Sequence, residues 1–196
     1  MDLREIRKEV ASLPNMAQAI DNFSQNWVRP IRSNTNPNMP FLQNLPADAK
    51  RELNGKLLQA QQMVGELRSA TQIHDKLHHY SRAMVDLTLS QMREDKTRTK
   101  VLTNQMLNDD LFGLPKAIDE VKNFEQNVQV LSDLYHDVNE LLHDHLSLEQ
   151  AVAFMDMPHY RYLQSIQKTA QQQRFLVRDI GHHFVSVTKK DTKRPI

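Results

Sequence analysis

Histidine is the residue type in this sequence with the clearest chemical potential, because its neutral ring binds metals and its pKa lies near neutral pH. The chain has nine histidines, several of them close together. His74 and His78 have the i, i+4 spacing that places two imidazole rings on one face of a helix. Glu140 and His143 have the Glu-x-x-His spacing of four-helix di-iron proteins.

These histidines do not complete a metal site in the sequence. A di-iron centre needs two Glu-x-x-His motifs and carboxylates from two further helices, whereas the motif occurs here once. The chain has no cysteine, which excludes thiolate zinc sites, iron–sulfur clusters and disulfide bonds. We therefore expect no cofactor, and a metal-binding helical bundle that uses His74, His78, Glu140 and His143 is the least favoured of three hypotheses.

The motifs of nucleophilic and nucleotide chemistry are missing as well. The sequence contains no Gly-x-Ser-x-Gly elbow, no phosphate loop and no dinucleotide glycine fingerprint. With only four glycines, a loop whose backbone closely approaches a phosphate is difficult to build. We therefore expect that the protein is not an enzyme and has no catalytic residues.

Basic residues form three local groups. Arg29 and Arg32 lie beside Trp27, which we expect to be a core residue rather than a stacking platform. The other two groups are Arg93, Lys96, Arg98 and Lys100, and, near the C-terminus, Lys189, Lys190, Lys193 and Arg194. Because the net charge is only +1, phosphate binding would depend on these local groups. Solvated helix ends are the simpler interpretation, and binding of RNA or a ribonucleoprotein is the alternative.

Three long windows without proline supply the elements that position these residues. Proline is absent from 47–114, 116–157 and 159–194, which are rich in helix-favouring residues. In the last two windows, apolar residues alternate steps of three and four, as in a coiled-coil seam. The seams are Val121, Phe124, Val128, Leu131, Tyr135, Val138, Leu142 and His145, and Leu163, Ile166, Ala170, Gln173, Val177, Ile180, Phe184 and Val187. We expect the polar members, His145 and Gln173, to fix helix register.

The first window carries a seam from Leu53 to Leu87 and a second apolar group that ends at Leu107. Between them, residues 93–100 are polar on every side but contain neither Gly nor Pro. We favour a helix here that projects beyond its neighbours, so that 47–107 is mainly one helix, and a loop between two helices is the alternative. Two successive steps of three near Ala70 form a stammer, which overwinds a coiled coil locally.

The remaining segments are shorter. Two short amphipathic helices are expected before and after Pro14, followed by an irregular loop, and a capping-box pattern at 147–150 predicts a short helix over 148–156. We predict an all-α fold, an elongated antiparallel bundle with coiled-coil-like packing of long helices. The expected parts are short helices and a loop at 1–45, the long-helix bundle at 46–188 and a basic flexible tail at 189–196.

The most favoured function is that of a non-enzymatic scaffold. Extended bundles present helical faces that bind another protein or a second copy of the chain without special residue chemistry. The N-terminal residues carry charges of both signs where a signal peptide needs an apolar core, and no apolar run approaches the roughly 20 residues that cross a bilayer. We therefore expect a cytoplasmic protein that does not insert into membranes.

Overall fold

The computed structural model describes residues 2–33, 44–109, 113–155 and 159–192. Every regular element in these ranges is helical, which confirms the all-α prediction. The elements are α1 (Leu3–Ser12), α2 (Met16–Phe23), the π-helix η1 (Ser24–Val28), α3 (Arg29–Ser33), α4 (Ala47–Ser69), α5 (Ile73–Met92), α6 (Lys96–Asn108), α7 (Leu114–His143), α8 (Leu148–Met155) and α9 (His159–Thr192). Elongated, antiparallel coiled-coil packing of the long helices stays a prediction.

The helices divide between two compact units, each assembled from segments that are distant in the sequence. Unit 1 contains residues 1–14, 72–125 and 169–196, and unit 2 contains residues 15–71 and 126–168. The long helices α7 and α9 each contribute residues to both units. These units are defined by contacts between residues, whereas the three parts expected from the sequence were defined by composition and pattern. The boundaries that we predicted between those parts, after residues 45 and 188, stay predictions.

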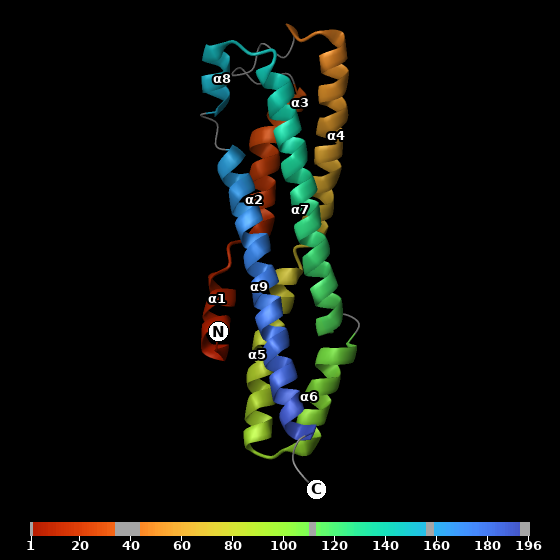
Figure 1. Cartoon of the computed structure of the whole chain (residues 1–196), viewed down its shortest axis with the longest axis vertical. Coiled ribbons are helices and arrows are strands. Elements are labelled where there is room, and N and C mark those ends of the chain that lie inside the picture. Colours follow the sequence, from red (N-terminus) through yellow and green to blue (C-terminus); the bar gives the residue numbers. More distant parts are fainter. Residues whose placement is uncertain (1, 34–43, 110–112, 156–158, 193–196) are drawn as a thin grey trace. The chain divides into compact units, whose positions relative to one another are not determined.

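In unit 1, α5 lies between α1 and α6 and packs against both (Figure 1). A capping box starts α1: Asp2 Oδ1 accepts a hydrogen bond from the Glu5 amide at 2.8 Å, and Glu5 Oε2 accepts one from the Asp2 amide at 3.2 Å. Ile6 and Val10 of α1 are completely buried. Since α1 has only this apolar stripe to bury, its position on α5 is set by these two side chains.

The segment 93–100 does not form the projecting helix that we favoured. α5 ends at Met92, and α6 begins at Lys96 and packs against α5. Asp95 starts the new helix, because its side chain accepts a hydrogen bond from the Arg98 amide at 3.0 Å. The hydroxyls of Ser90 and Thr99, 2.8 Å apart and buried, join the two helices. The fold-back gives these hydroxyls and Met106 a buried environment that a projecting helix would lack.

Glu94, in the turn between α5 and α6, is the one residue other than glycine that has a positive φ in the described ranges, at 56°. A left-handed conformation costs a residue with a Cβ roughly 1–2 kcal/mol. We therefore expect Glu94→Gly to be about 1 kcal/mol more stable than Glu94→Ala, since both lose the Glu94 side chain but only glycine removes the strain. Urea unfolding followed by circular dichroism measures the difference, and equal stability of the two variants would contradict the prediction.

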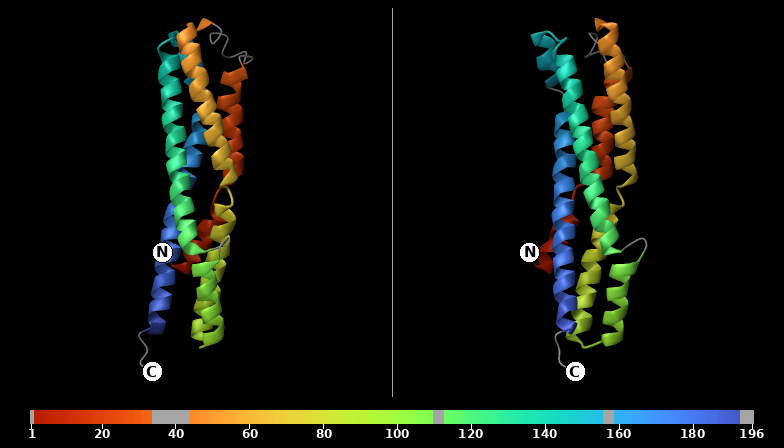
Figure 2. Two further views of the ribbon diagram at one scale, coloured as in Figure 1. Left: turned by 90° about the vertical axis from the view of Figure 1, so that its right-hand side faces the viewer. Right: turned by 45° about the vertical axis from the view of Figure 1, so that its right-hand side comes forward.

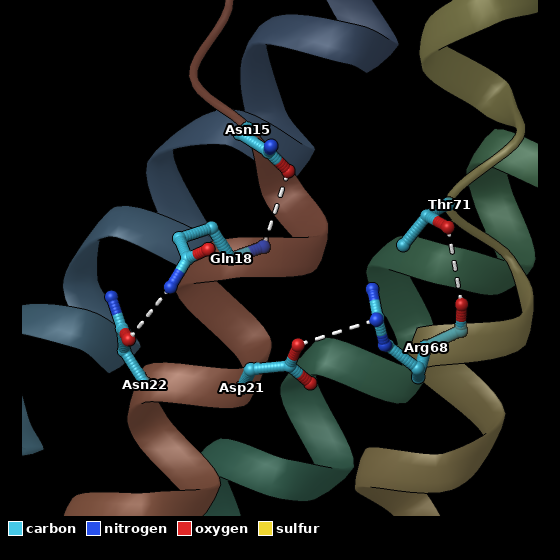
Figure 3. Close-up of polar contacts among 6 residues, drawn as sticks. All are labelled: Asn15, Gln18, Asp21, Asn22, Arg68 and Thr71. Carbon is cyan, nitrogen blue, oxygen red and sulfur yellow. Dashed lines mark hydrogen bonds and ion pairs between the residues drawn. The ribbon is translucent and has the colours of Figure 1, made fainter.

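The expected single helix over 47–107 is interrupted a second time, at residues 70–72, where α4 ends and α5 has not begun. Two hydroxyls donate to carbonyl groups at the end of α4. Ser69 Oγ donates to the Glu66 carbonyl at 2.7 Å. Thr71 Oγ1 donates to the Arg68 carbonyl at 3.1 Å, as Figure 3 shows. Such hydroxyls compete with the helical hydrogen bonds of the main chain. The predicted stammer therefore marks the end of a helix, and it coincides with the boundary between the units.

In unit 2, α2 lies beside α4 (Figure 2). Arg68 of α4 and Asp21 of α2 form an ion pair at 3.3 Å between the two helices (Figure 3). Between α2 and α3 the chain makes the wider π-turn of η1, in which the Arg29 amide bonds to the Ser24 carbonyl. Pro30 follows directly and has no N–H to donate, so the altered hydrogen-bond register accommodates a proline inside a helical stretch.

The two predicted seams are largely confirmed. Every predicted seam position of α7 up to Leu142 is buried, as is every one of α9 up to Phe184, including Gln173. His145 is an exception, since α7 ends at His143 and His145 is exposed in the following turn. The capping box before α8 is also confirmed, with Ser147 Oγ accepting from the Gln150 amide at 3.3 Å and Gln150 Oε1 accepting from the Ser147 amide at 3.0 Å.

Candidate interaction surfaces

A surface cavity of about 400 Å³ lies in unit 1 where α1 meets α5. Its lining residues are Leu3, Arg4, Arg7 and Lys8 of α1 and Val85 of α5. We call it the α1–α5 groove. Leu3 and Val85 are half-buried, whereas the three cations are exposed. The groove therefore combines two apolar side chains with a cationic rim.

The cations of α1 are segregated from its carboxylates. With about 100° between successive residues, Arg4, Arg7 and Lys8 share one side of α1, from beside the buried stripe to the face opposite it, and Glu5 and Glu9 lie on the other side. Glu5 is also occupied in the capping box. None of the ion pairs among the described residues involves the three cations, so their charge is not neutralised within the groove.

Exposed apolar side chains also lie further along α5, beyond the residues that line the groove. Leu89 and Met92 follow Val85 at steps of four and three, which keeps all three on one face of the helix. Leu89 is 41% exposed and Met92 is 76% exposed. Because α1 runs antiparallel to α5, its first turn points toward the end of α5 that carries them (Figure 1).

Unit 2 has an exposed apolar pair of its own on α8. Leu148 is 83% exposed and Val152 is 53% exposed, and their spacing of four places them on the same face. The helix is fixed at its start by the capping box of Ser147 and Gln150. These two side chains therefore form an exposed apolar face on α8.

The predicted phosphate-binding cations are partly brought together at one end of unit 1. Arg93, Lys96, Arg98 and Lys100 are all exposed at the turn before α6 and on its first turns. Gln91 Nε2 donates to the Val187 carbonyl of α9 at 2.9 Å, which places the exposed Lys189 near this turn. Lys190 belongs to the last turn of α9, and Lys193 and Arg194 lie outside the described residues.

The predicted metal ligands are divided between the two units. The rings of His74 and His78 meet edge to face with centroids 4.8 Å apart in unit 1, whereas Glu140 and His143 are exposed on the part of α7 that belongs to unit 2. Burial lowers the pKa of His78, and the charges of His74 and Arg82 lower it further. Within the described residues, no group of three or more His, Asp and Glu side chains is arranged to hold a metal ion.

A buried aromatic cluster in unit 2 was not foreseen from the sequence. Tyr135 Oη lies 2.8 Å from Nδ1 of the buried His159, and the Tyr135 ring contacts Trp27 at a centroid distance of 5.0 Å. Trp27 in turn stacks on Phe23 at 5.2 Å, which confirms that Trp27 is a core residue. The pairing of Tyr135 with His159 joins two helices, so no local sequence pattern predicts it. Its burial indicates a structural role.

No protein-family model, curated protein or solved structure matches this chain. Among the described helices, none is both long and apolar enough to span a membrane. The function is therefore inferred from the exposed surfaces of the two units and from their chemistry.

Proposed function

We propose that this protein is a non-enzymatic scaffold whose helical faces bind another protein or a second copy of the chain. The observation that carries the proposal is the exposure of large apolar side chains at helical spacing in both units, Leu89 and Met92 on α5 and Leu148 and Val152 on α8. A partner helix that covers these side chains removes their apolar surface from water. This burial stabilises the complex by about 25 cal/mol per Å².

Two further observations support this proposal. The described residues contain no assembled group of metal ligands, and the sequence has no motif of nucleophilic or nucleotide chemistry. A cytoplasmic location is part of the same proposal. It is supported by the absence of cysteine, since many small secreted domains depend on disulfide bonds.

Photo-crosslinking in the native cell tests the proposal. A photoreactive phenylalanine analogue replaces Leu148 in one variant and Met92 in another, and the exposed polar residues Glu52 and Asn104 serve as matched control positions. We expect light-dependent protein adducts at Leu148 or Met92 that survive nuclease and are absent at the controls. Adducts at neither apolar position, or adducts that nuclease removes, would refute a scaffold function.

A specific observation favours RNA binding as a second candidate. The hydrogen bond between Gln91 and the Val187 carbonyl joins the end of α5 to the end of α9, so the exposed Lys189 lies at the same end of unit 1 as the cations that precede and begin α6. RNA helices are recognised mainly through phosphates and shape, for which such a cationic end is suited. We propose this function only as the alternative to the scaffold.

The salt dependence of RNA binding tests this alternative. The group of α6 (Arg93, Lys96, Arg98, Lys100) and the C-terminal group (Lys189, Lys190, Lys193, Arg194) are replaced by Gln in separate variants. If both contact phosphates, each lost contact reduces the slope of log K against log salt by about 0.7–0.9 between roughly 50 and 200 mM. Replacement of the exposed Lys122, Lys168 and Arg178 by Gln is the control. Unchanged affinity and slope in both test variants would eliminate RNA binding through these groups.

A further inference from the structure

We propose that the α1–α5 groove is a docking site for an acidic, amphipathic segment of a partner protein. A large apolar side chain of that segment occupies the space between Leu3 and Val85, and its carboxylates face Arg4, Arg7 and Lys8. This inference rests on the proposed scaffold function and adds to it one surface and the chemistry of its partner.

The shape of the surface favours a peptide over a membrane. The groove is an open depression of about 400 Å³, which is large enough for one large apolar side chain. A lipid surface presents a broad plane of headgroups, which does not enter a concave site between two helices. A single Leu, Phe or Trp side chain projecting from a partner helix does enter it.

The charges select an acidic partner. Arg4, Arg7 and Lys8 are exposed on the same side of α1 and have no ion-pair partner among the described side chains. Arginine binds carboxylates through two parallel hydrogen bonds, so two arginines on adjacent turns match carboxylates on adjacent turns of a partner helix. Phosphates of RNA would also match the cations, but they offer nothing to the apolar Leu3 and Val85.

The length of the surface indicates the size of the segment. From Val85 to Met92 the apolar face of α5 extends over seven residues, or about 10 Å at 1.5 Å per residue. Together with the first turns of α1, this surface accommodates about three turns of helix. We therefore expect a partner segment of roughly 10–16 residues, with carboxylates on one side and two or three large apolar side chains on the other.

A peptide selection tests the inference on the full-length protein. A random 16-residue library displayed on phage is selected in parallel on the wild type and on the triple variant Arg4→Gln, Arg7→Gln, Lys8→Gln. Peptides enriched on the wild type alone are synthesised with a fluorophore, and their affinities are measured by anisotropy. We expect them to combine an excess of Asp and Glu with Leu, Phe or Trp, and to bind the triple variant at least tenfold more weakly.

Matched variants distinguish the groove from general electrostatics. The triple variant Lys122→Gln, Lys168→Gln, Arg178→Gln removes the same charge from exposed positions elsewhere, and we expect less than a twofold loss of affinity. Leu89→Ser with Met92→Ser tests the apolar face and should weaken binding severalfold. The substituted cations are all exposed, so we expect their replacement to leave the fold intact. Circular dichroism verifies the fold of every variant, including Leu89→Ser with Met92→Ser. If the α1 triple variant is unfolded, its three single substitutions replace it.

Two outcomes would overturn the proposal. One is that no acidic peptide distinguishes the wild type from the α1 variants. The other is that vesicles containing phosphatidylglycerol, or polyuridylate RNA, bind through Arg4, Arg7 and Lys8 more tightly than any selected peptide. Photo-crosslinking at Leu148 distinguishes the two proposals in both cases. Adducts at Leu148 would support the scaffold function even though the proposed docking site had been refuted. Absence of adducts at both Leu148 and Met92 removes the scaffold function itself.

Discussion

Replacing Trp27 by alanine is expected to lower the free energy of unfolding by about 3–5 kcal/mol, the range observed for large aromatic side chains removed from protein cores. Trp27 is completely buried and packs between Phe23 and Tyr135, with ring centroids 5.2 and 5.0 Å away. The cavity left behind is lined by rings that cannot collapse into it without leaving their own positions. Urea unfolding followed by far-ultraviolet circular dichroism measures the loss.

Two further variants identify the cause of this loss. Trp27→Phe should cost less than half as much as Trp27→Ala, because it keeps most of the ring contacts and removes Nε1, a buried donor without a hydrogen-bond partner in the described structure. Leu148→Ala serves as a control, since Leu148 is exposed, and it should change stability by less than about 0.5 kcal/mol. Equal losses for alanine and phenylalanine at position 27 would show that packing of the ring is not the cause.

Alkaline pH is expected to destabilise the protein steeply. Burial raises the pKa of Tyr80, and the negative charges of Glu120 and Asp109 raise it further. Burial is also the main cause of the raised pKa of Tyr135. In the unfolded chain both phenols ionise near pH 10, so their contribution to stability is complete below about pH 10 and is lost as pH rises through the folded pKa values.

Above pH 10 the expected slope for Tyr80 approaches about 1.4 kcal/mol per pH unit, and Tyr135 adds to the loss in the same direction. Urea unfolding at pH 9, 10 and 11 measures it. Tyr80→Phe should make the slope markedly shallower, although it also removes the hydrogen bond that Tyr80 Oη donates to the Gly113 carbonyl at 3.3 Å. Leu148→Ala removes an exposed side chain that does not titrate, and it should leave the slope as in the wild type. An unchanged slope in Tyr80→Phe would contradict the prediction.

The seams of α7 and α9 were predictable from the sequence because burial there depends on one repeating pattern. Val121, Phe124 and Val128 recur at steps of three and four, and a helix that buries one of them buries the others. His145 follows the same spacing, but the helix ends two residues before it. Periodicity predicts which face is buried and does not predict where the helix stops.

The interruptions of the first window depended on weaker features. Asp95 caps a helix, and Ser69 and Thr71 turn back to carbonyl groups, but such residues also occur on exposed helix faces without ending a helix. The choice between a projecting helix and a fold-back depends on whether Thr99 and Met106 find a buried surface. Tertiary contacts decide this, and they are not visible in a local pattern.

The candidate site was still less predictable. The sequence shows three cations and an apolar stripe at 3–13, but only the packing of α1 on α5 adds Val85 and forms a cavity. The histidines attracted attention through their number and spacing, whereas the structure places Glu140 and His143 in a different unit from His74 and His78. Residue type and spacing alone therefore did not indicate the α1–α5 groove.

The order in which the segments of the two units follow one another has a consequence for synthesis on the ribosome. Along the sequence, the segments of the two units alternate. The last segment of unit 2 ends at Lys168, whereas unit 1 also includes residues 169–196. During translation, the residues of unit 2 are all joined to the chain before residues 169–196 of unit 1 are added, and domains generally fold as their sequences become available. Unit 1 therefore cannot complete its packing until the second half of α9 has been made. Until then Ile6 and Val10, which are completely buried in the folded protein, belong to an incomplete unit, and we expect nascent unit 1 to expose more apolar surface than nascent unit 2.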